Sequence, residues 1–312
     1  AVELARRAGD PLAQSAALDA LTAAQSWAGD IFATAATTRR RVELLAAVPV
    51  TPASALERAN ALSEAAETSI AVGDLTTARR WAEQVRDLPL LAERGDFATS
   101  RLLVADALAG NAADVLAGSR RFLDAWERSG TLHSPTSAMA AAAVAMVHGL
   151  RGDDPARAQW LSIVGDLGAA PDETAGHTAV FDAIVLLHRG EADLAVQTLA
   201  ADPDDLDAWV LWVWRHWYVA LRAEAAAAAG HPDARGRIAT ARSAVAGNPI
   251  ATAVVDRAHG LLDGDQDRMA TAAAAFEAAG CRYQWARTLL LSEGEQAQAG
   301  AAALADLGFT AM

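Results

Sequence analysis

The chain has 312 residues, 39 of them acidic and 26 basic, and carries a net charge of −13 at pH 7. All 26 basic residues are arginine, which excludes sites that need a lysine, such as the phosphate-binding loop of nucleotide hydrolases or a Schiff base. Alanine fills 81 positions and aromatic residues make up only 5%, a balance that favours helix over sheet. The acidic charge disfavours direct contact with nucleic acid or anionic lipid, because both need a basic face.

The chain contains one cysteine, Cys281, and has neither a signal-peptide core nor an apolar run long enough to span a bilayer. We therefore expect a cytoplasmic location and no contact with a membrane. The first methionine is Met139, so we also expect the chain to be a segment of a longer protein.

Glycines followed by a polar residue recur along the whole chain at intervals of 30 to 44 residues. The eight glycines are Gly29, Gly73, Gly110, Gly152, Gly190, Gly230, Gly264 and Gly294. Glycine readily adopts the left-handed conformation that ends a helix, and a following Asp or Asn can cap the next helix. This pattern predicts the tight turn of a helix hairpin, used eight times.

The predicted helix pairs run, in chain order, 11–28 with 30–47, 52–72 with 74–87, 95–109 with 111–129, 135–151 with 153–167, 171–189 with 191–201, 204–229 with 232–246, 249–263 with 265–279, and 282–293 with 295–307. Most prolines fall near predicted helix starts, where a missing amide hydrogen costs little. Single hairpins of this size cannot bury an apolar face, so neighbours must share a continuous core.

The repeat length and the alanines near each turn favour a tetratricopeptide-like arrangement. Small residues stand seven positions before the turn glycine at Ala66, Ala145, Ala183 and Ala223, and five positions after it at Ala78, Ala195 and Ala299. We therefore predict one all-α domain over residues 1–312, a right-handed superhelix of about eight antiparallel hairpins. Two-helix repeats of another kind remain an alternative.

Catalytic and metal-binding patterns are weak in this chain. The seven histidines show no zinc-binding spacing, and Asp263, Asp265 and Asp267 lack the later ligands of a calcium loop, so helix capping explains them better. No nucleophile elbow is present, and Cys281 has no histidine nearby in the sequence. We predict no catalytic residue, no metal site and no cofactor.

The segment 209–218 carries four of the nine tryptophans. On a helix, two of its sides are apolar, as in a helix packed between neighbours, while a strip through Arg215, Val219 and Arg222 stays open. Packing is the favoured explanation. The functional hypothesis is that some rings line the superhelix groove and stack on a sugar or aromatic ligand, with arginines as polar anchors. The candidate binding residues are Trp209, Trp212, Trp217, Arg215, Arg222 and Asp182, the last because it precedes its turn glycine by the same distance as Arg222.

Three stretches are similar to the helical-repeat region of large actinobacterial regulators of the LuxR/MalT-like type. They are AVGDLTTARRWAEQVRDLPLL, AAVAMVHGLRGDD and the closing AFEAAGCRYQWARTLLLSEGEQAQAGAAALADLG. The resemblance spans most of the chain and implies an ATP-hydrolysing domain before the repeats and a helix-turn-helix domain after them. No catalytic residue carries over, since the family's phosphate-binding lysine has no counterpart here.

The resulting expectation is a non-catalytic sensor and scaffold of a transcriptional regulator. It would bind a small-molecule effector or protein partner and pass the signal to flanking ATPase and helix-turn-helix domains, without touching nucleic acid itself. The alternatives are a constitutive protein–protein scaffold and an enzyme whose site is dispersed over several repeats.

Overall fold

The computed structural model describes residues 2–91, 95–168, 171–206 and 212–310, with the side chains of 171–175 excepted. Within these ranges the chain forms α-helices and one short 3-10 helix, and no strand. The α-helices are α1 (Val2–Ala8), α2 (Pro11–Trp27), α3 (Ile31–Ala46), α4 (Pro52–Ala71), α5 (Leu75–Arg86), α6 (Gly95–Ala109), α7 (Ala112–Arg128), α8 (Pro135–Leu150), α9 (Asp154–Asp166), α10 (Pro171–His188), α11 (Ala192–Thr198), α13 (Arg215–Ala228), α14 (Ala234–Ala244), α15 (Pro249–Asp263), α16 (Gln266–Ala278), α17 (Arg282–Leu290) and α18 (Glu295–Asp306). The all-α prediction is confirmed for the described residues, and none of their helices is long and apolar enough to cross a membrane.

The predicted turns are present at all eight glycines, whose φ angles lie between 64° and 89°. Asp30, Asp74, Asp153 and Asp265 each accept a backbone hydrogen bond at the start of the following helix, as a capping residue should. Asn111 does not cap, because its side chain instead donates to Asp106. The turn chemistry read from the sequence therefore sets most helix ends.

One predicted helix begins too early. The sequence indicated helix from residue 204, but 203–206 form a turn and the described helix α13 starts only at Arg215. Asp202 belongs to this turn, where its carboxylate accepts from the amide of Asp204 rather than capping a helix. Such local Asp–backbone bonds compete with helix formation, which explains the error. The sequence also gave no sign of α1 or of the 3-10 helix Pro89–Leu91.

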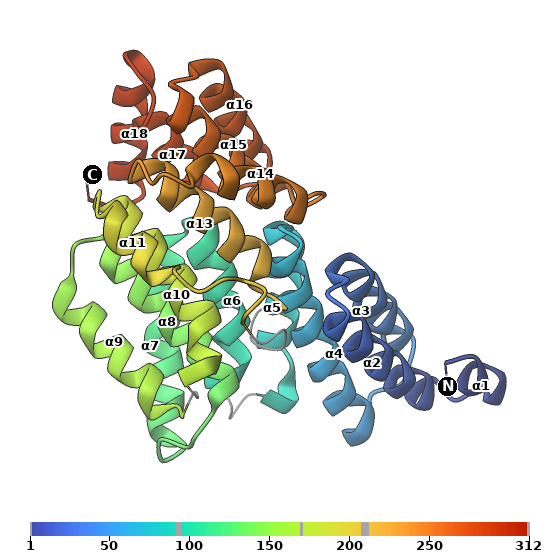
Figure 1. The fold of residues 1–312 in the computed structure, drawn as a ribbon. Helices are drawn as coiled ribbons and strands as arrows, with labels where there is room; N and C mark the ends of the chain where they lie inside the picture. The colour runs from blue at the N-terminus through green and yellow to red at the C-terminus, as the bar shows by residue number, and fades with distance from the viewer. Residues whose placement is uncertain (1, 92–94, 169–170, 207–211, 311–312) are drawn as a thin grey trace.

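Helices α4, α6, α8, α10 and α13 form a series that we call the inner layer, and α6, α8, α10 and α13 lie near the centre of Figure 1. Helices α4, α6, α8, α10 and α13 each contact the next, and α13 also contacts α4, so the series returns on itself. Nearly every side of α6 and α8 is buried, and one apolar core includes residues from Ile31 to Phe309. Six of the seven predicted contact alanines are buried, whereas Ala299 is exposed and the neighbouring Gly300 makes the close approach to α17.

The C-terminal third packs against the ends of earlier helices and satisfies their last carbonyl groups. Trp217 Nε1 donates to the carbonyl of Ile70 at 3.1 Å, and Asn248 Nδ2 donates to that of Ala71 at 2.9 Å, both at the end of α4. Thr310 donates to the carbonyl of Leu150, at the end of α8, through both its amide and its hydroxyl. These residues are 147 to 177 positions apart in the sequence. In an open solenoid each repeat contacts only its neighbours, so this contact between distant repeats is a departure from that rule.

A fully buried ion cluster joins three helices in this half. Glu224 of α13 accepts two hydrogen bonds from Arg257 of α15, at 3.0 and 2.7 Å, and one from Arg287 of α17 at 2.5 Å. Burial alone would raise the pKa of Glu224, but the two guanidinium groups outweigh it and lower this pKa below its usual value. Arg287 also donates to the carbonyl of Leu187 at the end of α10. The cluster therefore fixes α13, α15 and α17 relative to one another and to α10.

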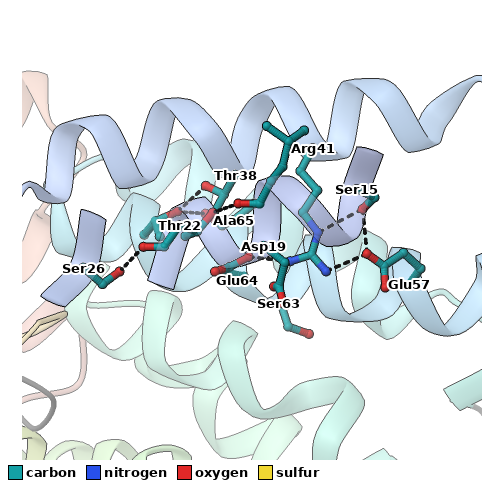
Figure 2. Close-up of polar contacts among 12 residues, drawn as sticks. Ser15, Asp19, Thr22, Ser26, Thr38, Arg41, Glu57, Ser63, Glu64 and Ala65 are labelled. Carbon is teal, nitrogen blue, oxygen red and sulfur yellow. Dashed lines mark hydrogen bonds and ion pairs between the residues drawn. The ribbon is translucent and has the colours of Figure 1, made fainter. Parts of the chain in front are cut away.

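A second polar network connects α2, α3 and α4 (Figure 2). The buried Arg41 guanidinium donates to Glu57 at 2.8 Å and to Glu64 at 2.7 Å, and it also pairs with Asp19. Burial, only partly offset by Arg41, raises the pKa of Glu64 to about 7. Burial acts on Glu57 in the same direction, but hydrogen bonds from Ser15 and Arg41 lower its pKa below the usual value. One guanidinium thus contacts three carboxylates, and the pKa values of two of them, Glu57 and Glu64, move in opposite directions.

Gly110 and Gly190 form a matched pair for testing the contact between distant repeats. Both have positive φ, 89° and 72°, but a Cβ on Gly110 would lie 2.7 Å from the amide nitrogen of Tyr283, whereas a Cβ on Gly190 would meet nothing within 4 Å. We expect Gly190→Ala to lower the free energy of unfolding by about 1–2 kcal/mol through backbone strain alone. Gly110→Ala should cost about 1–3 kcal/mol more through overpacking. Urea denaturation of the two variants measures the difference, and equal losses would contradict the packing of Tyr283 on this turn.

The raised pKa of Glu64 predicts a stability that falls as the pH rises. Between pH 4.5 and about 7 the folded state holds a proton that the unfolded state releases, so the free energy of unfolding decreases over this window. The loss should reach about 3 kcal/mol at most. Glu64→Gln, which stays neutral, should be more stable than wild type at pH 8 and similar to it near pH 4.5. The control Glu57→Gln should instead destabilise at pH 8, since its pKa is lowered; the same pH profile in Glu64→Gln and wild type would contradict the assignment.

Candidate functional site

A cleft of about 540 Å³ lies between α13 and α14, beside the turn at 202–204. This volume is in the range that small-molecule sites occupy. We call it the α13–α14 cleft. Its lining residues are Asp202, Pro203, Asp204, Arg215, Val219, Arg222, Pro232, Asp233, Gly236, Arg237, Thr240 and Ala244.

Helical periodicity explains which side chains reach the cleft. On α13 the strip that the sequence left open, Arg215, Val219 and Arg222, faces it, because residues four and three apart share one face of a helix. On α14 the same spacing brings Arg237 and Thr240 to the cleft, together with Gly236. A Cβ on Gly236 would meet nothing within 4 Å, so the missing side chain leaves part of the space open.

Three arginines and three aspartates line the cleft, and two of the arginines have an acidic partner. Arg215 pairs with Asp204 at 2.7 Å, and Arg222 pairs with Asp202 at the longer distance of 3.5 Å. The aspartates are the more exposed members: the Asp204 side chain is 82% exposed, compared with 19% for Arg222. The positive groups therefore lie deeper than the negative ones.

Two donor atoms in the cleft are buried without a hydrogen-bond partner. They are Nε of Arg222 and Nη1 of Arg237. Within the described ranges Arg237 forms no ion pair, although it is close enough to the phenol of Tyr218 to act on its pKa. Burial raises the pKa of Tyr218, with Asp202 acting in the same direction and both arginines opposing it. Buried donors are normally satisfied, so this end of the cleft is short of an acceptor.

The predicted binding residues are divided between the cleft and the core. Arg215 and Arg222 line the cleft, as expected from the open strip. Trp217 is only 1% exposed and packs against the end of α4, so it presents no free ring face to a ligand. Asp182 is not among the lining residues of the cleft and accepts from Arg157 of α9 at 2.7 Å.

The remaining two tryptophans do not complete an aromatic platform. Trp212 lies in the turn before α13 and is half-buried among core residues, while Trp209 lies outside the described residues. Trp214, which the sequence placed on the second apolar side, packs edge-to-face on Phe181 with the ring centroids 5.2 Å apart. Packing therefore accounts for the described tryptophans of this segment.

Sequence reasoning missed Arg237, the arginine without an acidic partner. Its signal was present but weak: Asp233, Arg237 and Thr240 follow the turn at Gly230 with the spacing of one helix face. Nothing in the linear pattern distinguished this face from a solvated surface. The neighbouring segment 202–206 was also predicted to lead into a helix. The sequence therefore did not indicate that Asp202, Pro203 and Asp204 form a turn that borders the cleft.

Reactive groups elsewhere are in structural positions. Burial raises the pKa of the Cys281 thiol to about 12, and this thiol faces the carbonyl of Leu108. Burial lowers the pKa of His188 to about 4, and its Nε2 lies 3.2 Å from the hydroxyl of Thr310. His188 is thus buried against the C-terminal residues. Among the residues that the structure describes, no group of three His, Cys, Asp or Glu side chains is placed to hold a metal ion.

Comparisons with known proteins give no assignment: no protein-family model matches the chain, and no curated protein matches it.

Trp217→Phe tests the structural role of this tryptophan. The substitution removes the hydrogen bond to the carbonyl of Ile70 and leaves a cavity, so we expect a loss of about 2–4 kcal/mol in the free energy of unfolding. Trp212→Phe, at a half-buried position, should cost about 1 kcal/mol or less. Urea denaturation compares the two variants. A larger loss in Trp212→Phe would contradict the assignment of Trp217 to the core.

Proposed function

We propose that this chain is the sensor and interaction region of a transcriptional regulator, built as a right-handed, tetratricopeptide-like superhelix. In this proposal it binds an effector in the α13–α14 cleft and performs no catalysis itself. The observation that carries the sensor role is the cleft, which combines a ligand-sized volume with polar groups from two helices and a turn. The regulator context rests on the sequence resemblance to LuxR/MalT-like proteins.

The location of α13 supports a role in signalling. One side of this helix lines the cleft through Arg215 and Arg222. Another side holds α4 through Trp217, and Glu224 connects it to α15 and α17. A ligand that draws α13 and α14 together therefore acts on a helix that is fixed to both the first and the last third of the chain.

Signal transfer follows from differential binding. A ligand shifts an equilibrium between two arrangements of the helices only by the difference in its affinity for them. Apolar side chains fill the space between the helices of the inner layer. In this proposal the two arrangements therefore differ in how the packed helices are placed against one another, because the packing of the described residues leaves no open channel for a ligand to fill. Attached ATPase and helix-turn-helix domains, located in the cytoplasm, would receive this shift.

The competing proposal is a constitutive protein scaffold without a small ligand. Its supporting observation is an apolar groove of about 340 Å³ on α3, α4 and α5, which includes Val42, Leu45, Leu62 and Leu88. The two proposals differ in whether a small molecule stabilises the fold.

Gly236→Leu places a side chain in the α13–α14 cleft, at a position where a Cβ would meet nothing within 4 Å. The added side chain meets open space on a helix, so stability should stay equal or rise by up to about 1 kcal/mol. A thermal-shift screen with sugars and metabolites should give ligands that raise the melting temperature of wild type. Gly236→Leu should lose this response. Gly165→Leu, also on a helix with open space around the glycine, is the matched control and should keep it.

Two results would overturn the proposal. Ligand responses that survive in Gly236→Leu would place the binding elsewhere, and the absence of any response in wild type would favour the scaffold. The regulator context has its own test, which is to read the gene on both sides of this segment. Finding neither an ATPase nor a helix-turn-helix domain there would remove that context and leave the cleft unaffected.

A further inference from the structure

We propose that the α13–α14 cleft binds a small organic anion, and that Arg237 is the residue that recognises its carboxylate or phosphate group. This inference rests on the proposed effector site and specifies the chemistry of its ligand. Arg237 is the one guanidinium among the described cleft residues that has no acidic partner. Its Nη1 is buried and makes no hydrogen bond.

A second donor points to the same chemistry. Nε of Arg222 is also buried without a partner, and the Asp202 carboxylate leaves it free because the contact is made by Nη2 at 3.5 Å. Arg222 on α13 and Arg237 on α14 line the same cleft. Guanidinium groups match carboxylate and phosphate oxygens in geometry and in charge.

The depth of the charges decides between an anion and a cation. The side chain of Asp204 is 82% exposed and that of Asp233 is 74% exposed, so water already solvates both carboxylates. Asp204 is also compensated by Arg215. A cation would find only carboxylates that are at least half exposed, with Asp202 at 52%, whereas an anion meets guanidinium groups of which Arg237 has no acidic partner among the described residues.

The size of the cleft indicates an anion with an organic body. A single phosphate or carboxylate group fills only part of about 540 Å³. Next to the arginines the cleft offers apolar contacts at Val219, Pro232 and Ala244 and a hydroxyl at Thr240. The remainder of the ligand therefore meets a mixed surface suited to a small metabolite.

The test measures thermal stability in sodium phosphate, sodium acetate and sodium chloride at equal ionic strength. We expect phosphate or acetate to raise the melting temperature of wild type above its value in chloride, and the responding salt tells which anionic group is preferred. Arg237→Gln should weaken the apparent affinity about tenfold or more, because a charge-assisted hydrogen bond is lost. Arg237→Lys should keep part of the response. Arg235→Gln, on the same helix but paired with Asp263 and outside the cleft, is the control and should match wild type.

Equal responses in wild type and Arg237→Gln, or no response beyond that to chloride in wild type, would overturn the inference. A neutral metabolite that is blocked by Gly236→Leu but binds Arg237→Gln with unchanged affinity would overturn it as well, while leaving the proposed effector site intact. Arg237→Gln is expected to fold normally, since the arginine forms no ion pair in the described structure.

Discussion

The buried ends of the inner helices are the constraint on which this structure depends. The last carbonyl groups of a helix have no partner within it, and burying them without one costs free energy. Here α4, α8 and α10 end inside the protein, and their terminal carbonyls accept hydrogen bonds from Trp217, Thr310 and Arg287. The donors come from the second half of the chain, so an open spiral would lose these hydrogen bonds and expose the apolar core around them to water.

This return contact gives α13 a special position. Its tryptophan closes the inner layer against α4, its glutamate lies at the centre of the buried ion cluster, and its arginines border the cleft. A buried carboxylate with two guanidiniums contributes little net stability compared with apolar packing, but removing one member leaves a charge uncompensated. The cluster therefore favours one arrangement of α13, α15 and α17.

Because the chain has no lysine, all of its buried basic side chains are arginines. Arginine keeps its charge when buried and forms several directed hydrogen bonds at once, which a lysine cannot do in the same geometry. Arg41 connects three helices near the N-terminus, and Arg257 does so in the second half. Both are buried and fully engaged, whereas Arg237 has the same chemistry without an acidic partner. Among the three arginines of the cleft, Arg237 is therefore the one that no described carboxylate engages.

The sequence by itself determined the local structure: turn glycines such as Gly73 and capping residues such as Asp74 set the helices, since these depend on φ angles and neighbouring amides. It also predicted the open strip on α13 that lines the cleft. Only the tertiary structure decided that Trp217 belongs to the core, that Asp182 pairs with α9, and that Arg237 and Arg222 line one cleft. These outcomes depend on contacts between residues far apart in the chain, and local periodicity carries no information about them.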